Sequence, residues 1–403
     1  MSEKTRSGGM RVIRSIDDAL MAVAAVGPVA RAQAQKAEDA RRLPVEVVDA
    51  IAAAGLWGVF APRCVGGAGL GALESQFRVV SAMAYEDASA GWGIFICAGT
   101  PGLIASRLPA AGRDEVFADG VLPAAGVFNP GGGARPVDGG WRVSGSWPFA
   151  SGIGYAGWVM ANAIVLDESG KPAPGVAGLP EIRSFVVRPD AVTIVDDWHV
   201  AGLRGTGSMT FTMKDVFVPE HRTFPFFGPA LINEPSYRLP LLSYVNPSFV
   251  GMAVGLARRA VDELVQLLPT KIGPPTFQPA SADPSKQLRL GRAMAAIGAT
   301  TDAAEALYRR IDARVAAGED LMQLPLRERA EMRARATAAV ETCVEVVNDL
   351  FRLGGASSIY EPGCLQRLWR DTNVLGQHLF LRDSNFEVPA KVAMGIDTES
   401  PFI

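Results

Sequence analysis

Two short segments of this chain mix aromatic residues with serine, threonine and glycine, a combination suited to binding a flat ring. Residues 147–152 read Trp-Pro-Phe-Ala-Ser-Gly, and residues 202–208 read Gly-Leu-Arg-Gly-Thr-Gly-Ser. Apolar side chains can form the walls of such a site, glycines allow close backbone approach, and hydroxyl or N–H groups can bind the polar edge of the ring. Together the segments predict a flavin site, whereas one such segment alone is more often a plain turn.

The length and charge of the chain are those of an ordinary globular protein. Its 403 residues are enough for two or three domains with a large buried core. Hydrophobic residues make up 48% and charged residues 20%, the net charge is −3, and no basic stripe with interleaved aromatic residues is present. We therefore expect a small-molecule substrate and no nucleic-acid partner.

The cysteines and histidines are scattered. The four cysteines have neither the paired spacing of a zinc site nor the density of a disulfide scaffold, and we interpret them as reduced core thiols. They are Cys64, Cys97, Cys343 and Cys364. Three histidines form no ligand cluster, so no metal site is expected. Neither a signal peptide nor an uninterrupted apolar run of membrane-spanning length is evident, which favours a cytoplasmic protein that does not insert into a membrane.

Periodicity divides the chain into three regions. Alanine-rich amphipathic runs typical of helices fill residues 1–122, short alternating runs rich in valine and aromatic residues fill 123–223, and long helical runs fill 224–403. We expect an α+β architecture with an N-terminal helical domain, a middle antiparallel β-sandwich or barrel, and a C-terminal four-helix bundle. The bundle helices are expected at residues 247–268, 285–317, 326–353 and 365–382.

This order of elements, combined with five motifs, resembles the acyl-CoA dehydrogenase superfamily over nearly the whole chain. The motifs are Gly55-Leu-Trp-Gly58 with Gly66-Gly-Ala-Gly69, Phe128-Asn-Pro-Gly-Gly132, residues 147–152, residues 202–208 with Val216-Phe-Val-Pro219, and Gly354-Gly-Ala356 with Arg370-Asp371. The resemblance implies a flavin cofactor and a homotetramer packed through its C-terminal bundles. The resemblance implies flavin contacts for residues of these motifs, and we infer further contacts for residues close to them. Together these residues are Phe128, Asn129, Phe149, Ala150, Ser151, Gly152, Trp198, Arg204, Thr206, Ser208 and Arg370.

Two reactions are compatible with this fold, because one fold hosts different chemistry. The dehydrogenases of the family remove an α-proton with a carboxylate often placed eight residues before the Arg of the Arg-Asp pair. That position is Pro362 here, so an FAD-dependent acyl-CoA dehydrogenase would have to use the neighbouring Glu361. A non-catalytic flavin-binding relative is a third alternative, which no motif favours.

His378 and the Phe-Ala-Ser-Gly ending at Gly152 resemble the flavin monooxygenase branch instead. Members of that branch take reduced flavin from a separate reductase, react it with O2 and hold a C4a-hydroperoxyflavin that transfers one oxygen atom to the substrate. The resemblance implies FMN or FAD as the flavin, with His378 and Ser151 as catalytic residues. Their chemistry suits the task, since an imidazole can orient a peroxide or move a proton and a hydroxyl can hold the flavin N5 region.

The substrate is predicted only by class. Four apolar residues are candidates for lining its pocket, although each would serve equally as core. They are Trp92, Phe95, Phe249 and Met252. Phenol-hydroxylating members carry a histidine near residues 94–99, and here none precedes position 199. This weakens the case for a simple phenol, and we expect hydroxylation or N-oxygenation of a small aromatic or natural-product-type substrate.

Overall fold

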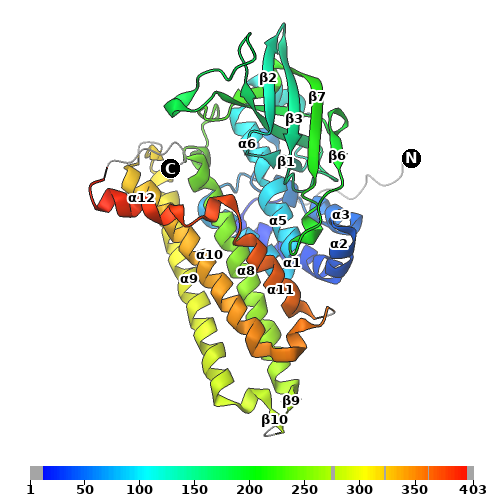
Figure 1. The fold of residues 1–403 in the computed structure, drawn as a ribbon, viewed down its shortest axis with the longest axis vertical. Coiled ribbons are helices and arrows are strands. Elements are labelled where there is room, and N and C mark those ends of the chain that lie inside the picture. Colours follow the sequence, from blue (N-terminus) through cyan, green and yellow to red (C-terminus); the bar gives the residue numbers. More distant parts are fainter. Residues whose placement is uncertain (1–11, 274–276, 322–323, 362, 397–403) are drawn as a thin grey trace. The chain divides into compact units, whose positions relative to one another are not determined.

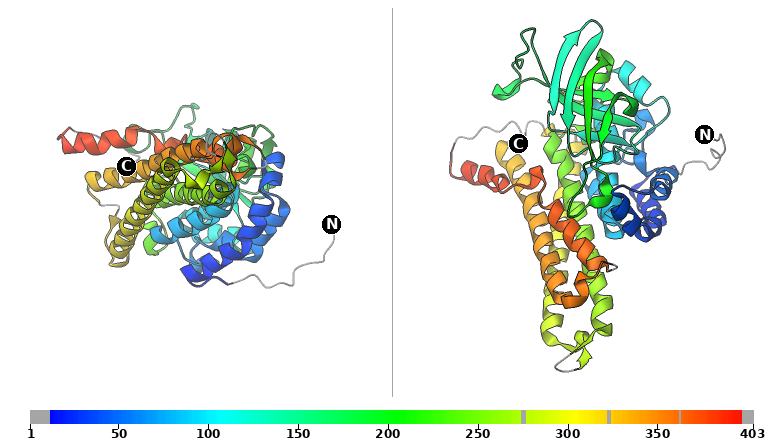
Figure 2. Two further views of the ribbon diagram at one scale, coloured as in Figure 1. Left: turned by 90° about the horizontal axis from the view of Figure 1, so that it is seen from below. Right: turned by 45° about the vertical axis from the view of Figure 1, so that its right-hand side comes forward.

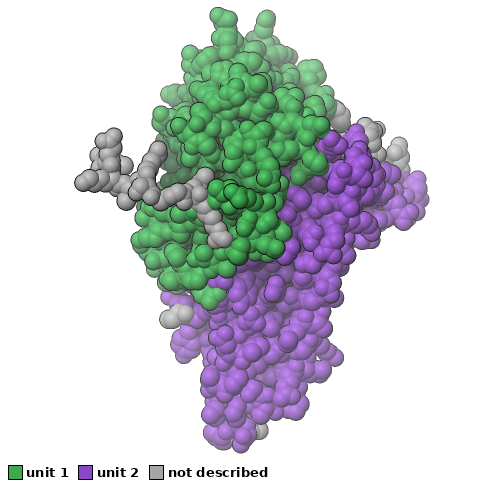
Figure 3. All heavy atoms as spheres, turned by 180° about the vertical axis from the view of Figure 1, so that it is seen from behind, with its two compact units in different colours: residues 1–71, 92–199, 204–237 green, residues 72–91, 200–203, 238–403 purple. Residues whose placement is uncertain are grey.

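The computed structural model describes residues 12–273, 277–321, 324–361 and 363–396, and the contacts among them divide the chain into two units (Figure 3). Unit 1 contains the described chain up to Gly71 with Trp92–His199 and Arg204–Tyr237. Unit 2 contains Ala72–Gly91, Val200–Leu203 and the described chain from Arg238. The order of helices, strands and again helices along the chain is the predicted one (Figure 1).

Unit 1 is built around an eight-stranded sheet with the order β6-β7-β3-β2-β4-β5-β8, in which β1 pairs with β4. The strands are β1 (Ala124–Val127), β2 (Gly132–Val137), β3 (Gly140–Trp147), β4 (Trp158–Val165), β5 (Ile182–Val187), β6 (Thr193–Val195), β7 (Thr210–Pro219) and β8 (Thr223–Pro225). Most neighbouring strands are antiparallel, as predicted. Two pairings differ from that expectation, because β4 runs parallel to both β1 and β2 and makes the sheet mixed.

Strand β3 shows why this region folds as a sheet and how it positions the segment that follows. Its side chains alternate between buried and exposed, with Trp141, Val143 and Trp147 turned inward. The Trp147 ring stacks on Phe211 of β7 at 5.1 Å between centroids, and its indole N–H donates to the Asn162 carbonyl at 2.6 Å. Strand β3 is therefore anchored at its last residue, directly before the predicted flavin segment.

Short helices complete unit 1. They are α1 (Ile16–Ala32), α2 (Ala34–Ala40), α3 (Val45–Ala53), α5 (Ala88–Cys97), α6 (Gly99–Arg107) and α7 (Ala110–Val116), and α5 enters the unit at Trp92. Residues 88–107 form the one described stretch long and apolar enough to cross a membrane, but 89% of its apolar window is buried. A buried stretch of this kind behaves as a core element of a folded domain.

Unit 2 is a helical bundle in which α8, α9 and α10 run side by side (Figures 1 and 2). Its helices are α4 (Leu73–Glu86), α8 (Leu241–Thr270), α9 (Pro284–Ala316), α10 (Leu326–Gly354), α11 (Cys364–Leu375) and α12 (Ser384–Ala393). Helix α4 packs closely on α8 because Gly251 and Gly255 lack side chains. A Cβ atom at Gly255 would lie 2.4 Å from the Ser81 carbonyl oxygen.

The fourth bundle helix ends earlier than predicted. Helix α11 stops at Leu375, whereas the sequence pattern extends the helix to Arg382. Gly376 and Gln377 lead out of the helix, and His378 then caps a 3-10 turn, η11 (Leu379–Leu381). Apolar residues at positions 379–381 continue a helix-like spacing, which hides this break from a periodicity argument.

Candidate functional site

The two segments singled out by the sequence lie against each other in unit 1. The Ala150 N–H donates to the Met209 carbonyl at 3.2 Å, and the Gly152 N–H donates to the Thr206 carbonyl at 3.0 Å. The second segment contains a 3-10 turn, η5 (Arg204–Thr206), that leads into β7. Two stretches about fifty residues apart in the sequence thus form one surface lined by hydroxyl groups and glycines.

Phe149 is an exposed aromatic residue held in an unfavourable backbone conformation. Its φ is +65°, in the left-handed region, which costs a residue with a side chain about 1–2 kcal/mol. Its side chain is 68% exposed, and its ring meets the buried Trp198 edge to face at 6.0 Å. Strained residues of this kind cluster at ligand sites, and the two rings offer an apolar wall for a planar ligand.

A continuous chain of buried polar groups lies beside this wall. The Trp92 indole N–H donates to Ser151 Oγ at 2.8 Å, Ser151 Oγ lies 2.8 Å from Ser208 Oγ, and Ser208 Oγ lies 2.7 Å from Thr206 Oγ1. All four residues are buried. Ser151 and Ser208 therefore have fixed partners, and Trp92, predicted to line the substrate pocket, contacts the predicted catalytic serine.

Cys97 and Tyr155 support the backbone of Ser151 from behind, and the sequence argument missed this role. Cys97 Sγ lies 3.5 Å from the Ser151 carbonyl oxygen and 3.6 Å from the Tyr155 hydroxyl. A Cβ atom at Gly152, whose φ is +72°, would lie 2.4 Å from Cys97 Sγ, so only glycine fits there. Burial raises the pKa of the Cys97 thiol to about 12, so this thiol is neutral and packs rather than reacts.

The prediction of buried cysteines holds for Cys97 and Cys343, which are free and buried. It is wrong for Cys64, which is exposed, and Cys364 is only partly buried. Burial also raises the pKa of Cys343 to about 12. Among the described residues, no group of three or more His, Cys, Asp or Glu side chains could hold a metal ion.

His378 lies in unit 2 inside a cluster of aromatic rings. Its ring centroid is 4.5 Å from that of Phe249 on α8 and 5.2 Å from that of Phe380. The Phe380 backbone N–H donates to His378 Nδ1 at 3.2 Å, which caps η11. Burial among these rings lowers the pKa of His378 to about 4.

The cap fixes the tautomer of His378. Because Nδ1 accepts a hydrogen bond and the ring is neutral near pH 7, the proton of the imidazole must lie on Nε2. A neutral imidazole with this tautomer presents a hydrogen-bond donor at Nε2 and has no free lone pair for a base. Of the two roles that the sequence left open for His378, orienting an oxygen through a hydrogen bond fits this state, because a neutral imidazole is too weak an acid to give up its remaining proton.

The depressed pKa of His378 predicts a stability change in mild acid. The unfolded chain takes up a proton at this residue near its ordinary value of 6.5, whereas the folded protein does so near 4. The stabilising contribution is therefore complete above pH 6.5 and is lost as the pH falls to 4, by at most about 3 kcal/mol. Thermal midpoints of the wild type and His378→Asn across this range test it, and parallel curves for the two proteins would contradict the assignment.

Arg370 and Asp371 on α11 hold the residues that precede η5, and all of these groups belong to unit 2. Buried Asp371 accepts the Leu203 N–H through Oδ1 at 2.6 Å. Arg370 donates from Nη1 to the Ala201 carbonyl and from Nε to Gln366 Oε1, both at 2.8 Å. Leu203 has a φ of +52°, so the carboxylate stabilises a strained residue.

These contacts give the Arg-Asp pair a structural task. The contact between Arg370 and a flavin stays a prediction, as does the flavin contact of Arg204, which is exposed at the start of η5.

The remaining predicted residues lie in different surroundings. The Phe128 carbonyl accepts a hydrogen bond from Asn162 at 2.8 Å, and Asn129 is exposed beyond the end of β1. Phe95 packs edge to face on Trp92 at 5.2 Å. Met252 is fully buried on α8, so its role as a substrate contact stays a prediction.

Glu361, the base required by the dehydrogenase alternative, is exposed.

The donors and walls of unit 1 fit a flavin. An isoalloxazine ring has two broad apolar faces and a rim of hydrogen-bonding atoms, and unit 1 supplies the exposed Phe149 ring beside Trp198 together with the buried hydroxyls of Ser151 and its partners. The strain at Phe149 agrees with a binding role for this segment.

Comparisons with known proteins point in one direction. Two family profiles match, the acyl-CoA dehydrogenase N-terminal domain over residues 21–116 and the acyl-CoA dehydrogenase C-terminal domain over residues 248–383. The chain is 30% identical to a pigment production hydroxylase from a Rhodococcus species, over 94% of this chain and 97% of that protein. It is also 30% identical to the oxygenase component of an FADH(2)-dependent resorcinol hydroxylase from a Rhizobium species, over 89% of each.

The structural comparison agrees. The solved structure of XiaF from a Streptomyces species in complex with FADH2 and glycerol superposes with a TM-score of 0.88. The two sequences are 27% identical, and the match covers 96% of this chain and 98% of that chain.

Proposed function

Because the chain belongs to the flavin-dependent monooxygenases of the acyl-CoA dehydrogenase family, we propose that it oxygenates a small aromatic compound as the oxygenase component of a two-component system. A separate reductase supplies its reduced flavin. The observation that carries the assignment of the site is the pairing of the segment at Ser151 with the segment at Ser208, which joins hydroxyl donors to an aromatic wall.

We propose reduced FAD as its flavin. The resorcinol hydroxylase and XiaF, both similar over most of their length, are described with FADH2. The bound reduced flavin would supply the two electrons that activate O2, of which one atom enters the substrate and the other leaves as water. Phe149 and Trp198 would flank the ring, and Ser151 would hydrogen-bond to its edge.

His378 contributes a hydrogen-bond donor in an apolar setting. Its Nε2–H can donate a hydrogen bond to a developing negative charge on oxygen, and the low polarity around Phe249 and Phe380 strengthens that interaction. The same setting keeps the imidazole neutral near pH 7. We assign to His378 a hydrogen bond that orients the reacting oxygen and to Ser151 the hydrogen bond to the flavin.

The ring clusters support an aromatic substrate. Unit 1 presents Trp92 packed against Phe95, and unit 2 presents Phe249 with Phe380 beside the proposed catalytic histidine. Aromatic side chains favour edge-to-face and offset contacts with planar ligands, which a flexible aliphatic chain does not make. Substrates with a fused or substituted aromatic ring are therefore preferred to acyl thioesters.

Anaerobic titration of the purified chain with photoreduced FAD tests the proposal. We expect saturable binding of the reduced flavin, tighter than that of oxidised FAD. On exposure to air, candidate aromatic substrates should each gain one oxygen atom, detected by mass spectrometry with ¹⁸O2. A protein that keeps oxidised FAD tightly bound, and whose yellow colour an acyl-CoA thioester bleaches, would instead be a dehydrogenase.

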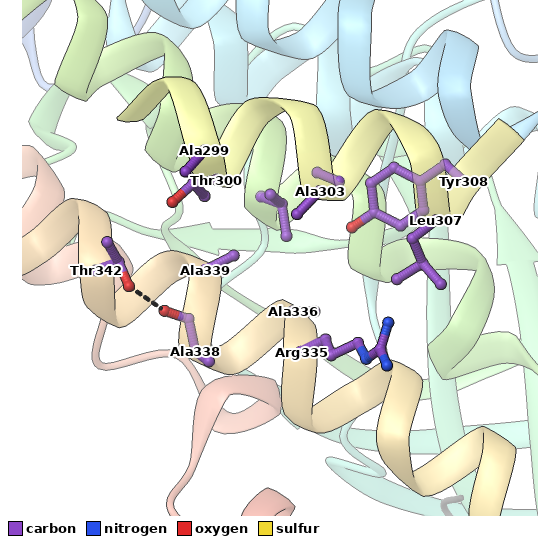
Figure 4. A pocket seen from close by; sticks show the side chains of 12 residues that line it. Ala299, Thr300, Ala303, Leu307, Tyr308, Arg335, Ala336, Ala338, Ala339 and Thr342 are labelled. Atoms are coloured by element: carbon purple, nitrogen blue, oxygen red, sulfur yellow. Dashed lines mark hydrogen bonds between the residues drawn. The ribbon is translucent and has the colours of Figure 1, made fainter. Parts of the chain in front are cut away.

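A homotetramer in the cytoplasm is the proposed form of the enzyme. Helices α9 and α10 border an open pocket of about 320 Å³ lined mainly by alanine and threonine, as Figure 4 shows. Leu288 and Met294 on α9 are more than half exposed. An apolar surface with small side chains allows a second helix to approach closely, which supports association through this bundle. Light scattering on the full chain should give about four times the monomer mass of 42.6 kDa.

A further inference from the structure

The indole of Trp92 fixes the hydrogen-bonding of Ser151. An indole N–H can donate and cannot accept, so the 2.8 Å contact occupies one lone pair of Ser151 Oγ in every arrangement of the protons. Trp92 is 7% and Ser151 5% exposed, so water competes little for either group. This contact spans 59 positions along the sequence and joins α5 to the segment after β3.

The direction of the hydroxyl contacts decides what Ser151 can still donate. Either oxygen can be the donor in the contact between Ser151 and Ser208 and in the contact between Ser208 and Thr206. When Ser208 donates to Ser151, Trp92 and Ser208 fill both lone pairs of Ser151 Oγ, which then donates its own hydrogen to a further acceptor.

We propose that Trp92 is a positioning residue, which holds Ser151 Oγ in the arrangement in which Ser208 donates to it and the serine donates its own hydrogen to the bound flavin. This inference rests on the proposed function, since it takes reduced flavin as the ligand of Ser151. It assigns Trp92 an effect on flavin binding that passes through Ser151.

Flavin binding by single and double variants tests whether Trp92 acts through Ser151. Trp92→Phe keeps an apolar ring and removes the donor, so reduced FAD should bind about 5- to 20-fold more weakly, the effect of one buried hydrogen bond. In the Ser151→Ala background the same change should alter the dissociation constant less than about 2-fold, because the target of the indole is already gone. Penalties that multiply in the double variant would show that Trp92 acts on the ligand directly and would overturn the proposal.

A second buried tryptophan provides the matched control. Trp158 of unit 1 is 5% exposed, and its indole nitrogen has no hydrogen-bond partner among the described residues. Trp158→Phe therefore makes a similar loss of ring volume without losing a hydrogen bond, and binding of reduced FAD should stay within about 2-fold of the wild type. An equal loss of affinity in Trp158→Phe and Trp92→Phe would show that core packing causes the effect and would overturn the proposal.

Indole NMR signals report the contact without any flavin. In protein labelled with ¹⁵N at tryptophan, the signal that disappears in Trp92→Phe identifies Trp92, and it should move to higher field in Ser151→Ala. An unmoved signal would overturn the inference. Flavin binding by the wild-type protein tests the proposed function separately. If the wild type fails to bind reduced flavin, the proposed function is overturned even if the Trp92 signal responds as expected.

Discussion

His378→Ala is expected to lower the yield of oxygenated product per reduced flavin consumed by about 100-fold, with the missing oxygen released as hydrogen peroxide. The variant removes the Nε2–H donor on the opposite side of the ring from the capped Nδ1, and one positioned hydrogen-bond donor contributes about 10²- to 10³-fold to such reactions. Product can be measured by chromatography and peroxide by a peroxidase assay, with chemically reduced FAD added so that no reductase is needed.

Two further substitutions separate the catalytic from the structural task of His378. Asparagine can place its side-chain oxygen near the position of Nδ1 and so keep the cap on the Phe380 N–H, but it has no group at the position of Nε2. His378→Asn should therefore fold like the wild type and be as uncoupled as His378→Ala. His378→Gln should recover part of the yield through its amide N–H. Full coupling in His378→Asn would limit His378 to capping η11.

Asp371→Ala is expected to destabilise the protein by about 2–3 kcal/mol and to weaken binding of reduced flavin more than tenfold. The carboxylate is buried and accepts the Leu203 N–H, and its removal leaves that donor without its partner while Leu203 keeps a strained φ. The residues of η5 follow Leu203 directly, so a loosened Leu203 frees the start of the segment that ends in Thr206 and Ser208. Thermal midpoints and flavin dissociation constants measure the two effects.

Controls distinguish lost charge from lost geometry at this contact. Asp371→Asn keeps an oxygen acceptor for the Leu203 N–H, and its loss of stability should be less than half that of Asp371→Ala. Leu203→Gly adopts the same positive φ without strain but removes a buried leucine side chain, whose loss costs about 2–5 kcal/mol, so this variant should be less stable than the wild type. A wild-type thermal midpoint and wild-type flavin binding in Asp371→Ala would refute the role of this residue.

Local patterns predicted the elements of the fold well. The region of short alternating runs expected at residues 123–223 contains β1 to β7, and the helix expected at residues 326–353 is α10. Asp138-Gly139 is a residue pair typical of tight hairpin turns, and Gly139 takes a φ of +74° between β2 and β3. These features depend on neighbours in the sequence, so the sequence alone contains them.

The features that the sequence did not reveal are long-range. Nothing local indicates that the indole of Trp92 meets Ser151, or that Asp371 accepts the Leu203 N–H across 168 positions. Phe149 at positive φ contradicts residue preferences, because aromatic residues avoid that region unless other contacts impose it. The polar network of the site is therefore a product of tertiary packing, while its residue types were apparent beforehand.

The two units alternate along the chain, and this affects which gene segments homologues can exchange by recombination. The backbone passes from one unit to the other at five points, after Gly71, Gly91, His199, Leu203 and Tyr237. A break at any one point of the chain therefore leaves at least one unit without part of its sequence. Exchange of unit 2 between related genes would need several breakpoints, which agrees with the near end-to-end alignment with the Rhodococcus hydroxylase.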